Sequence, residues 1–138
     1  MHFHYNFTEE FEAVEGVLCL IADGKKIQLK PAEKLTVAPR ISHKFYNPSE
    51  ETIIFRVKLF PGQPDFENFI KTVFGLVNDG KTWKNQIPKN PLQAAVVFKW
   101  GDTHLANYLF RKGEPLLNKL YEKAVKNGIE AELKNKYC

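Results

Sequence analysis

Short alternating and apolar segments fill the first sixty residues of the chain. The stretch "TEEFEAVEG" (8–16) alternates polar and apolar residues up to Gly16, and "VLCLIA" (17–22) is a short apolar run. Asp23-Gly24 forms a hairpin signal before "KKIQLK" (25–30) resumes the alternation. Further strands are expected at "KLTVAP" (34–39), "HKFYN" (43–47) and "ETIIFRVKLF" (51–60). Strands this short, separated by turn residues, predict an antiparallel sandwich or barrel of six or seven strands.

From residue 64 onward the apolar spacing becomes helical. A stripe spaced for one helix face consists of Phe66, Phe69, Ile70, Val73, Phe74 and Val77. It predicts a helix that begins near Pro64 and ends before Gly80. Two more helices are expected within 92–100 and 114–128, and the last ten residues are expected to fray. The pattern therefore predicts a mainly β protein with a β-barrel over 1–62. It also predicts a helical tail of two or three helices over 63–138 that packs on the barrel, so that the two parts form one structural domain.

Composition and charge narrow the function classes. The net charge of +4 comes from lysines scattered along the chain, so no focused basic face is predicted and nucleic acid is not an expected partner. No apolar run reaches the roughly 18 residues of a membrane helix, so no membrane partner is expected. Cys19 lies in an apolar run and Cys138 is the last residue given. The first residues lack a basic region followed by an apolar stretch, so a signal peptide is not expected. We therefore expect a cytoplasmic protein without disulfides.

The residues with the clearest chemistry stand at the start, in "MHFHYNFTEE". Residues two apart on a strand point to the same face, so His2 and His4 converge, and Phe3 and Tyr5 lie on the other face. Histidine is the commonest metal ligand. A third imidazole from His43 or His104 and a carboxylate would complete a mixed nitrogen–oxygen metal site.

Two motifs in this region resemble those of the cupin superfamily. In the first, His2-Phe3-His4 is followed after four residues by Glu9, and after six more by Gly16. The second resembles "AEKLTVAPRISHKFYN" (32–47), in which His43 and Asn47 are in register. Ala32, Ala38 and Arg40 replace its first Gly, its Pro and its second Gly. Arg40 therefore stands where the backbone can require a positive φ, which is costly for a residue with a side chain. Residues beyond 60 resemble an uncharacterised subgroup of small cupins with a helical tail.

The resemblance implies a jelly-roll barrel in which His2, His4, Glu9 and His43 face one metal ion. Glu10 is the rival carboxylate, but the spacing to Gly16 and strand parity both favour Glu9. Such a donor set suits Fe(II), Mn(II), Ni(II) or Co(II) with open positions, and zinc is also compatible. Family members usually have one or two strands before the His-x-His pair. We therefore expect either an upstream segment or a homodimer that pairs the open edge.

The first functional hypothesis is a metal-dependent enzyme that acts on a small organic molecule, with oxygenation as the first reaction considered. Isomerisation and decarboxylation are alternatives, as are a non-catalytic small-molecule-binding module and a scaffold held closed by the metal. Phe11, Phe45 and Phe55 are candidates for an apolar pocket wall or for plain core. No general acid or base stands out beyond Tyr5 and Lys58, which both also suit the surface. The catalytic residues and the substrate are not identified by the sequence.

Overall fold

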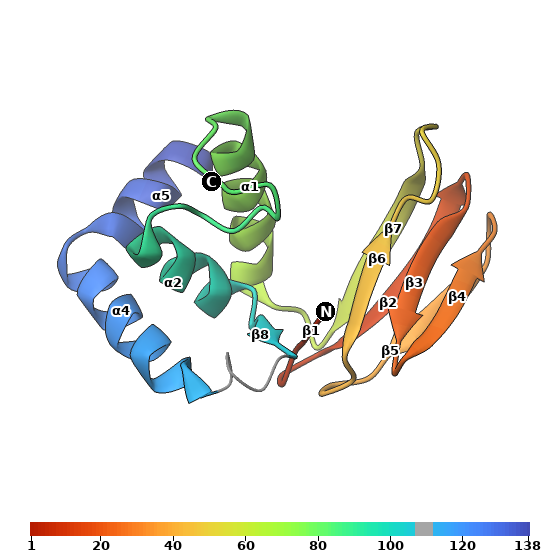
Figure 1. The fold of residues 1–138 in the computed structure, drawn as a ribbon, viewed down its shortest axis with the longest axis horizontal. Helices are drawn as coiled ribbons and strands as arrows, with labels where there is room; N and C mark the ends of the chain where they lie inside the picture. The colour runs from red at the N-terminus through yellow and green to blue at the C-terminus, as the bar shows by residue number, and fades with distance from the viewer. Residues whose placement is uncertain (107–111) are drawn as a thin grey trace. The chain divides into compact units, whose positions relative to one another are not determined.

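The computed structural model describes residues 1–106 and 112–138, and these divide into two compact units. The first unit comprises Met1–Gln63 with His104–Ala106, and it contains all of the named strands (Figure 1). The second comprises 64–103 and 112–138, and contains the helices that the structure describes. That the helical part packs on the β part as one domain stays a prediction.

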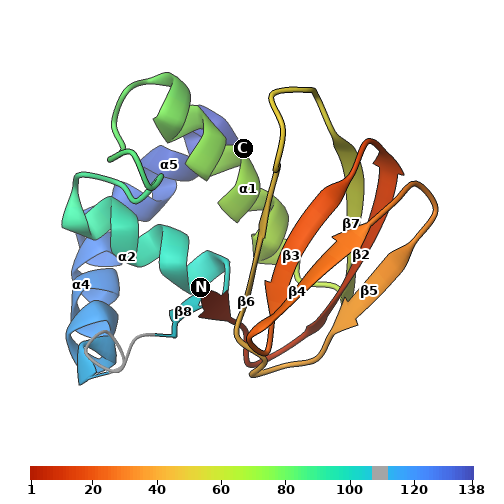
Figure 2. The same ribbon diagram turned by 45° about the vertical axis from the view of Figure 1, so that its right-hand side comes forward.

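The β unit consists of two antiparallel sheets. Its strands are β1 (His2–Phe3), β2 (Thr8–Glu15), β3 (Leu18–Ala22), β4 (Lys25–Leu29), β5 (Lys34–Val37), β6 (His43–Tyr46), β7 (Ile54–Phe60) and β8 (His104–Leu105). One sheet has the order β4-β3-β6-β1-β8 and the other β5-β2-β7, and the turned view in Figure 2 separates them. The strands predicted between residues 8 and 60 are confirmed. The predicted closed barrel is not seen among the described residues.

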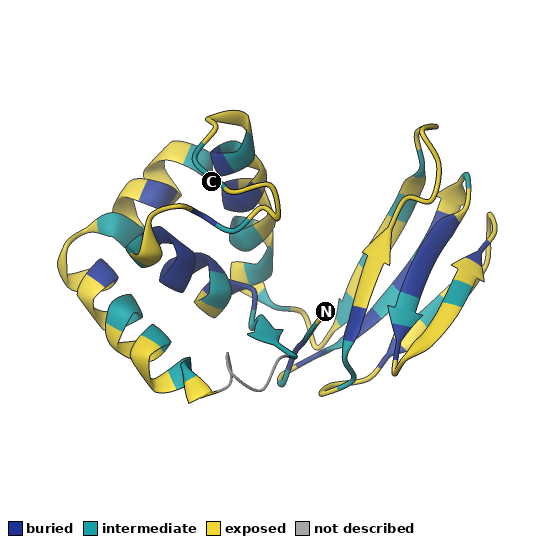
Figure 3. Cartoon of the chain, viewed as in Figure 1, coloured by how far each residue is buried: buried dark blue, intermediate teal, exposed yellow. Residues whose placement is uncertain are grey.

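Strand parity separates a core face from a charged face. Along β2 the inward residues Glu9, Phe11 and Ala13 are buried, as the sequence predicts, and β3 contributes Leu18 and Leu20 to the same core (Figure 3). On the outer face, by contrast, Glu10 and Glu12 form ion pairs with lysines and an arginine of the neighbouring strands β5 and β7. Exposed pairs of this kind add little stability. Parity thus puts the Glu9 carboxylate inside the unit and the Glu10 carboxylate outside.

The backbone conformation at the turns can be compared with the motif positions at Gly16, Ala32, Arg40 and Asn47. Gly16 has a φ of +74°, and a Cβ there would lie 2.8 Å from Ile53 Cγ2, so glycine is needed twice over. Ala32 and Arg40 have φ values of 72° and 69°, so Arg40 has the positive φ that its motif position can require. Asn47 accepts a hydrogen bond from the Ser49 amide at 2.9 Å and caps the turn after β6. Ala32 and Arg40 therefore both adopt the left-handed conformation that glycine adopts without cost.

The helical unit contains α1 (Pro64–Asn78), α2 (Pro91–Trp100), α4 (Glu114–Lys126) and α5 (Ile129–Tyr137). The first three confirm the predicted helices, although the buried residues of α1 are Thr72, Val73 and Leu76, and Ile70 and Phe74 of its predicted stripe are exposed. The expected fraying of the last ten residues is wrong. Helix α5 is anchored because Glu130 accepts hydrogen bonds from Trp100 Nε1 at 2.9 Å and from the Tyr121 hydroxyl at 3.0 Å. Leu133 of α5 is buried in the same core. Among the described residues, no helix has the length and apolarity needed to cross a bilayer.

Candidate metal centre

Four side chains of metal-ligand type converge at one end of the β unit. His2, His4, Glu9 and His43 each offer one ligand atom, and these atoms all lie within 4.8 Å of one another. The His2 ring lies 4.9 Å from that of His4 and 4.4 Å from that of His43, measured between centroids. His4, Glu9 and His43 are buried, and His2 is half-buried. The four residues proposed from the sequence are therefore neighbours in space, and one of them reaches the surface.

The backbone positions these residues from three strands. Strand β1 pairs with β6 so that His2 lies opposite His43, and β6 is also paired with β3 through Ala22. Glu9 arrives from β2, in the facing sheet. The Arg40 amide donates a hydrogen bond of 2.7 Å to the His4 carbonyl, which fixes the chain just beyond β1. The ligand set therefore depends on pairing between segments that are far apart in the sequence.

The His43 ring is held in an orientation that suits metal binding. Its Nδ1 lies 2.9 Å from the Ile41 carbonyl oxygen, which can only accept, so Nδ1 carries the proton. In the neutral ring, Nε2 then presents a lone pair toward Glu9 Oε2, 2.7 Å away. Neither atom has a hydrogen-bond partner of acceptable geometry among the described residues. Two acceptors facing each other in a buried site call for a cation or a proton, and a ring N–H bound to a backbone carbonyl is the usual support of a ligating histidine.

The charge states within the group also suit ligation. Burial, together with the neighbouring His43 and His4, lowers the pKa of His2 to about 3, so its ring is neutral near pH 7. Burial raises the pKa of Glu9, but hydrogen bonds and positive charge from His4 and His43, in the forms where these rings carry the proton that the facing atoms call for, outweigh burial and lower this pKa to about 2. Neutral imidazole and ionised carboxylate are the forms that bind metals.

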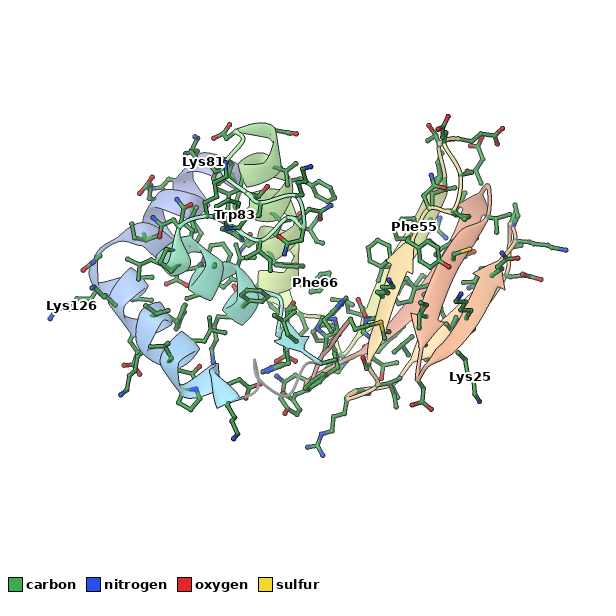
Figure 4. All side chains as sticks on the ribbon, in the orientation of Figure 1. Lys25, Phe55, Phe66, Lys81, Trp83 and Lys126 are labelled. Atoms are coloured by element: carbon green, nitrogen blue, oxygen red, sulfur yellow. The ribbon has the colours of Figure 1, made fainter. Side chains whose placement is uncertain are left out.

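A chain of aromatic rings leads away from the ligands. The Phe11 ring lies 6.1 Å from that of His43 and 5.8 Å from that of Phe45, and Phe45 lies 5.1 Å from Phe55. Phe11 is fully buried, whereas Phe45 is 46% exposed although it shares a strand face with His43. By its register with Ala22, Lys25 belongs to the same face, but Figure 4 shows its side chain directed away from the sheets. The structure thus joins the three predicted phenylalanines into one apolar surface.

Other candidates fall elsewhere. His104 was expected in the helical tail, yet it lies on β8 opposite Phe3, on the face of β1 that points away from the ligands. Tyr5 also lies on that reverse face, beside His104. Lys58 extends from the outer face of β7 toward Glu10, 3.9 Å away. Neither Tyr5 nor Lys58 therefore reaches the ligand group.

Sequence reasoning missed two neighbours of the site. Phe7 stacks on the His4 ring, with centroids 4.4 Å apart. Leu105 of β8 lies opposite His2 and so shares its face. Phe7 lies between the motif residues His4 and Glu9, a position from which stacking could have been suspected. Leu105 belongs to a strand too short to leave a periodic pattern.

Comparison with known proteins does not identify the chain. No family model matches it, and neither does any curated protein sequence. Among solved structures it is similar to one named "Putative sugar phosphate isomerase", from Acidithiobacillus ferrooxidans, with 19% identity and a TM-score of 0.38. The match covers 41% of this chain and 36% of that one. A likeness this limited carries no argument about function.

Proposed function

We propose that this chain is a metal-dependent protein of the cupin type, whose centre of His2, His4, Glu9 and His43 acts on a small organic molecule. One observation carries the proposal: three imidazoles and one carboxylate converge in a mostly buried group, their ligand atoms within 4.8 Å of one another. Such a set suits a divalent Fe, Mn, Ni or Co ion with coordination positions left for a substrate, and zinc is compatible. Oxygenation is the first reaction to test.

The strand order supports the cupin-type jelly roll. Strands β1, β3, β4 and β6 lie in one sheet and β2, β5 and β7 in the other, so the chain passes repeatedly between the sheets. The pairing of β2 with β7 and of β1 with β6 joins segments about forty or more residues apart, as expected when a strand pair wraps around a core. Positive φ at Gly16, Ala32 and Arg40 supports the match of the two motifs.

Each residue of the site has a separate role in this proposal. His2, His4 and His43 would hold the metal through neutral ring nitrogens, and Glu9 would lower the net charge of the centre. A bound metal supplies Lewis-acid or redox chemistry. Phe11, Phe45 and Phe55 would exclude water and hold the apolar part of the substrate against the centre.

Metal binding is the first test, and Glu9 and Glu10 provide a matched pair. Elemental analysis of protein purified without chelator should find about one transition-metal ion per chain. Calorimetric titration with Co(II) should then show that Glu9→Gln weakens binding more than about 100-fold, beyond the usual loss for an outer-shell residue. Glu10→Gln, which changes the adjacent carboxylate on the outer face, should leave binding unchanged. A wild-type protein that binds no metal, or equal effects of the two variants, would refute the metal centre.

Turnover is a separate test. Oxygen consumption by the Fe(II)-loaded protein should be measured against a panel of small aromatic and aliphatic hydroxy compounds. Phe45→Ala should reduce turnover of responsive compounds, whereas Phe60→Ala should not, because Phe60 is similarly exposed but lies on the outer face of β7. If metal is bound and no compound is consumed, the same panel assayed for isomerised and decarboxylated products distinguishes the alternative reactions from a binding module.

A further inference from the structure

The fourth histidine of the chain, which is not a ligand, lies directly behind the metal-binding strand. His104 on β8 is paired with Phe3 on β1, and directly opposed residues of an antiparallel pair project to the same face. His2 on β1 and His4, the residue just after it, flank Phe3 in the chain, and their rings lie 4.9 Å apart. The His104 ring therefore lies on the Phe3 side of the backbone, opposite the side to which these two candidate ligands point.

The contacts of His104 bracket the ligand His4. Its ring stacks on Phe3 with centroids 5.4 Å apart and an interplanar angle of 22°, and it meets the Tyr5 ring edge-on at 4.4 Å. Phe3 and Tyr5 also contact each other at 5.1 Å. The Arg40 guanidinium lies 5.5 Å from the centre of the Tyr5 ring, and its backbone amide binds the His4 carbonyl. The residues on either side of His4 are thus both packed against one ring.

Among the described residues, the backbone pairings of strand β1 are short. The strand is two residues long, and its pairing with β6 involves His2 and His43 alone. Its pairing with β8 covers both of its residues, and the Ala106 amide adds a hydrogen bond to the Met1 carbonyl at 3.3 Å. A ligand carried by so short a strand can be placed accurately only if neighbouring side chains lock its backbone.

We propose that His104 is a positioning residue for the metal centre: by stacking behind β1 it fixes the direction in which His2 and His4 project. The inference rests on the proposed metal centre but concerns a residue outside the ligand set. The inference depends on a flat ring at position 104, because the contacts with Phe3 and Tyr5 are contacts between ring faces and edges.

The test measures Co(II) affinity by calorimetry and the visible absorption of the bound Co(II), which reports the number and geometry of its ligands. His104→Ala should weaken Co(II) binding at least about tenfold, the scale expected for an outer-shell residue, and should change the absorption spectrum. His104→Phe keeps a flat ring, and should bind Co(II) more tightly than His104→Ala and have a spectrum closer to that of the wild type. His104→Gln keeps much of the side-chain volume but lacks the ring. It should weaken Co(II) binding and change the spectrum as His104→Ala does, and it replaces His104→Ala in the test if that variant folds poorly.

The control is Leu29→Ala, which removes a buried side chain from β4, at the opposite edge of the same sheet. It should destabilise the unit and leave Co(II) affinity and spectrum unchanged at temperatures where it is folded. Wild-type affinity and spectrum in His104→Gln would overturn the inference while leaving the metal centre intact. Equal weakening by His104→Phe would overturn the stacking argument. A wild-type protein without Co(II) binding would refute the metal centre itself, and the inference with it.

Discussion

Gly75 lies near the C-terminal end of α1, at a point where the Tyr137 ring of α5 packs against the helix. A Cβ built on Gly75 would overlap Tyr137 Cδ1 and lie 2.7 Å from Cε1 and 2.9 Å from Cγ. The clash involves the base of the ring, so a small rotation of the side chain cannot remove it. Replacing Gly75 with alanine should therefore destabilise the helical unit, although the same change in an open helix stabilises it.

Two opposing contributions decide whether Gly75→Ala raises or lowers the free energy of unfolding. Alanine in place of a helical glycine gains about 0.5–1 kcal/mol. Displacing a fully buried aromatic side chain costs about 3–5 kcal/mol, and for the half-buried Tyr137 we take about half of that, roughly 2 kcal/mol. The displaced ring also loses the hydrogen bond that its hydroxyl donates to Asp79 at 2.7 Å. The expected net effect of Gly75→Ala is thus a loss of about 1 kcal/mol or slightly more.

Tryptophan fluorescence during urea unfolding measures this effect selectively. The two tryptophans of the chain, Trp83 and Trp100, both belong to the helical unit, and Trp100 is buried beside α5. In a Tyr137→Ala background, Gly75→Ala should become stabilising by about 0.5–1 kcal/mol, because the clash is gone. A stabilising effect in the wild-type background, or the same effect in both backgrounds, would show that the ring does not pack on Gly75 as described.

The remaining predictions concern a turn residue, the loss of stability at low pH and the removal of bound metal. Ala32→Gly should raise the free energy of unfolding by about 0.5–1 kcal/mol. Ala32 has a φ of 72°, and removing the steric strain of a Cβ in that left-handed conformation gains more than the entropy cost of glycine. Thermal unfolding followed by circular dichroism measures this change, and a loss of stability would contradict it. Hydrogen bonds from Lys136 and Tyr137 lower the pKa of Asp79 from 3.8 to about 2, so its contribution is present above about pH 4 and is lost as the pH falls through about 2. Asp79→Asn should flatten that part of the pH–stability curve, and an unchanged curve between pH 4 and 2 would rule out the contribution. Removing bound metal with a chelator should lower the unfolding temperature of the wild type but not of Glu9→Gln, since only a protein that binds metal gains stability from it.

The sequence was enough to predict most strands of the β unit, and, with the motif resemblance, which three histidines and one glutamate lie together. Alternation along "TEEFEAVEG" places Glu9 inward and Glu10 outward, because successive strand side chains point to opposite faces whatever the partner strand is. The same period brings His2 and His4 to one face, and the motif spacing adds His43. The motif position of Arg40 only raised the question of a positive φ, and the structure answered it with a φ of 69°.

Contacts between distant segments were decided by the tertiary structure alone. The pairing of Phe3 with His104 joins residues about a hundred positions apart through two-residue strands, which are too short to show any period. Helix α5 has a weak apolar stripe and is ordered by Glu130 and Leu133 meeting partners on other helices. The chain's own pattern therefore determines which face a ligand occupies, while the position of the strand that carries it depends on long-range packing.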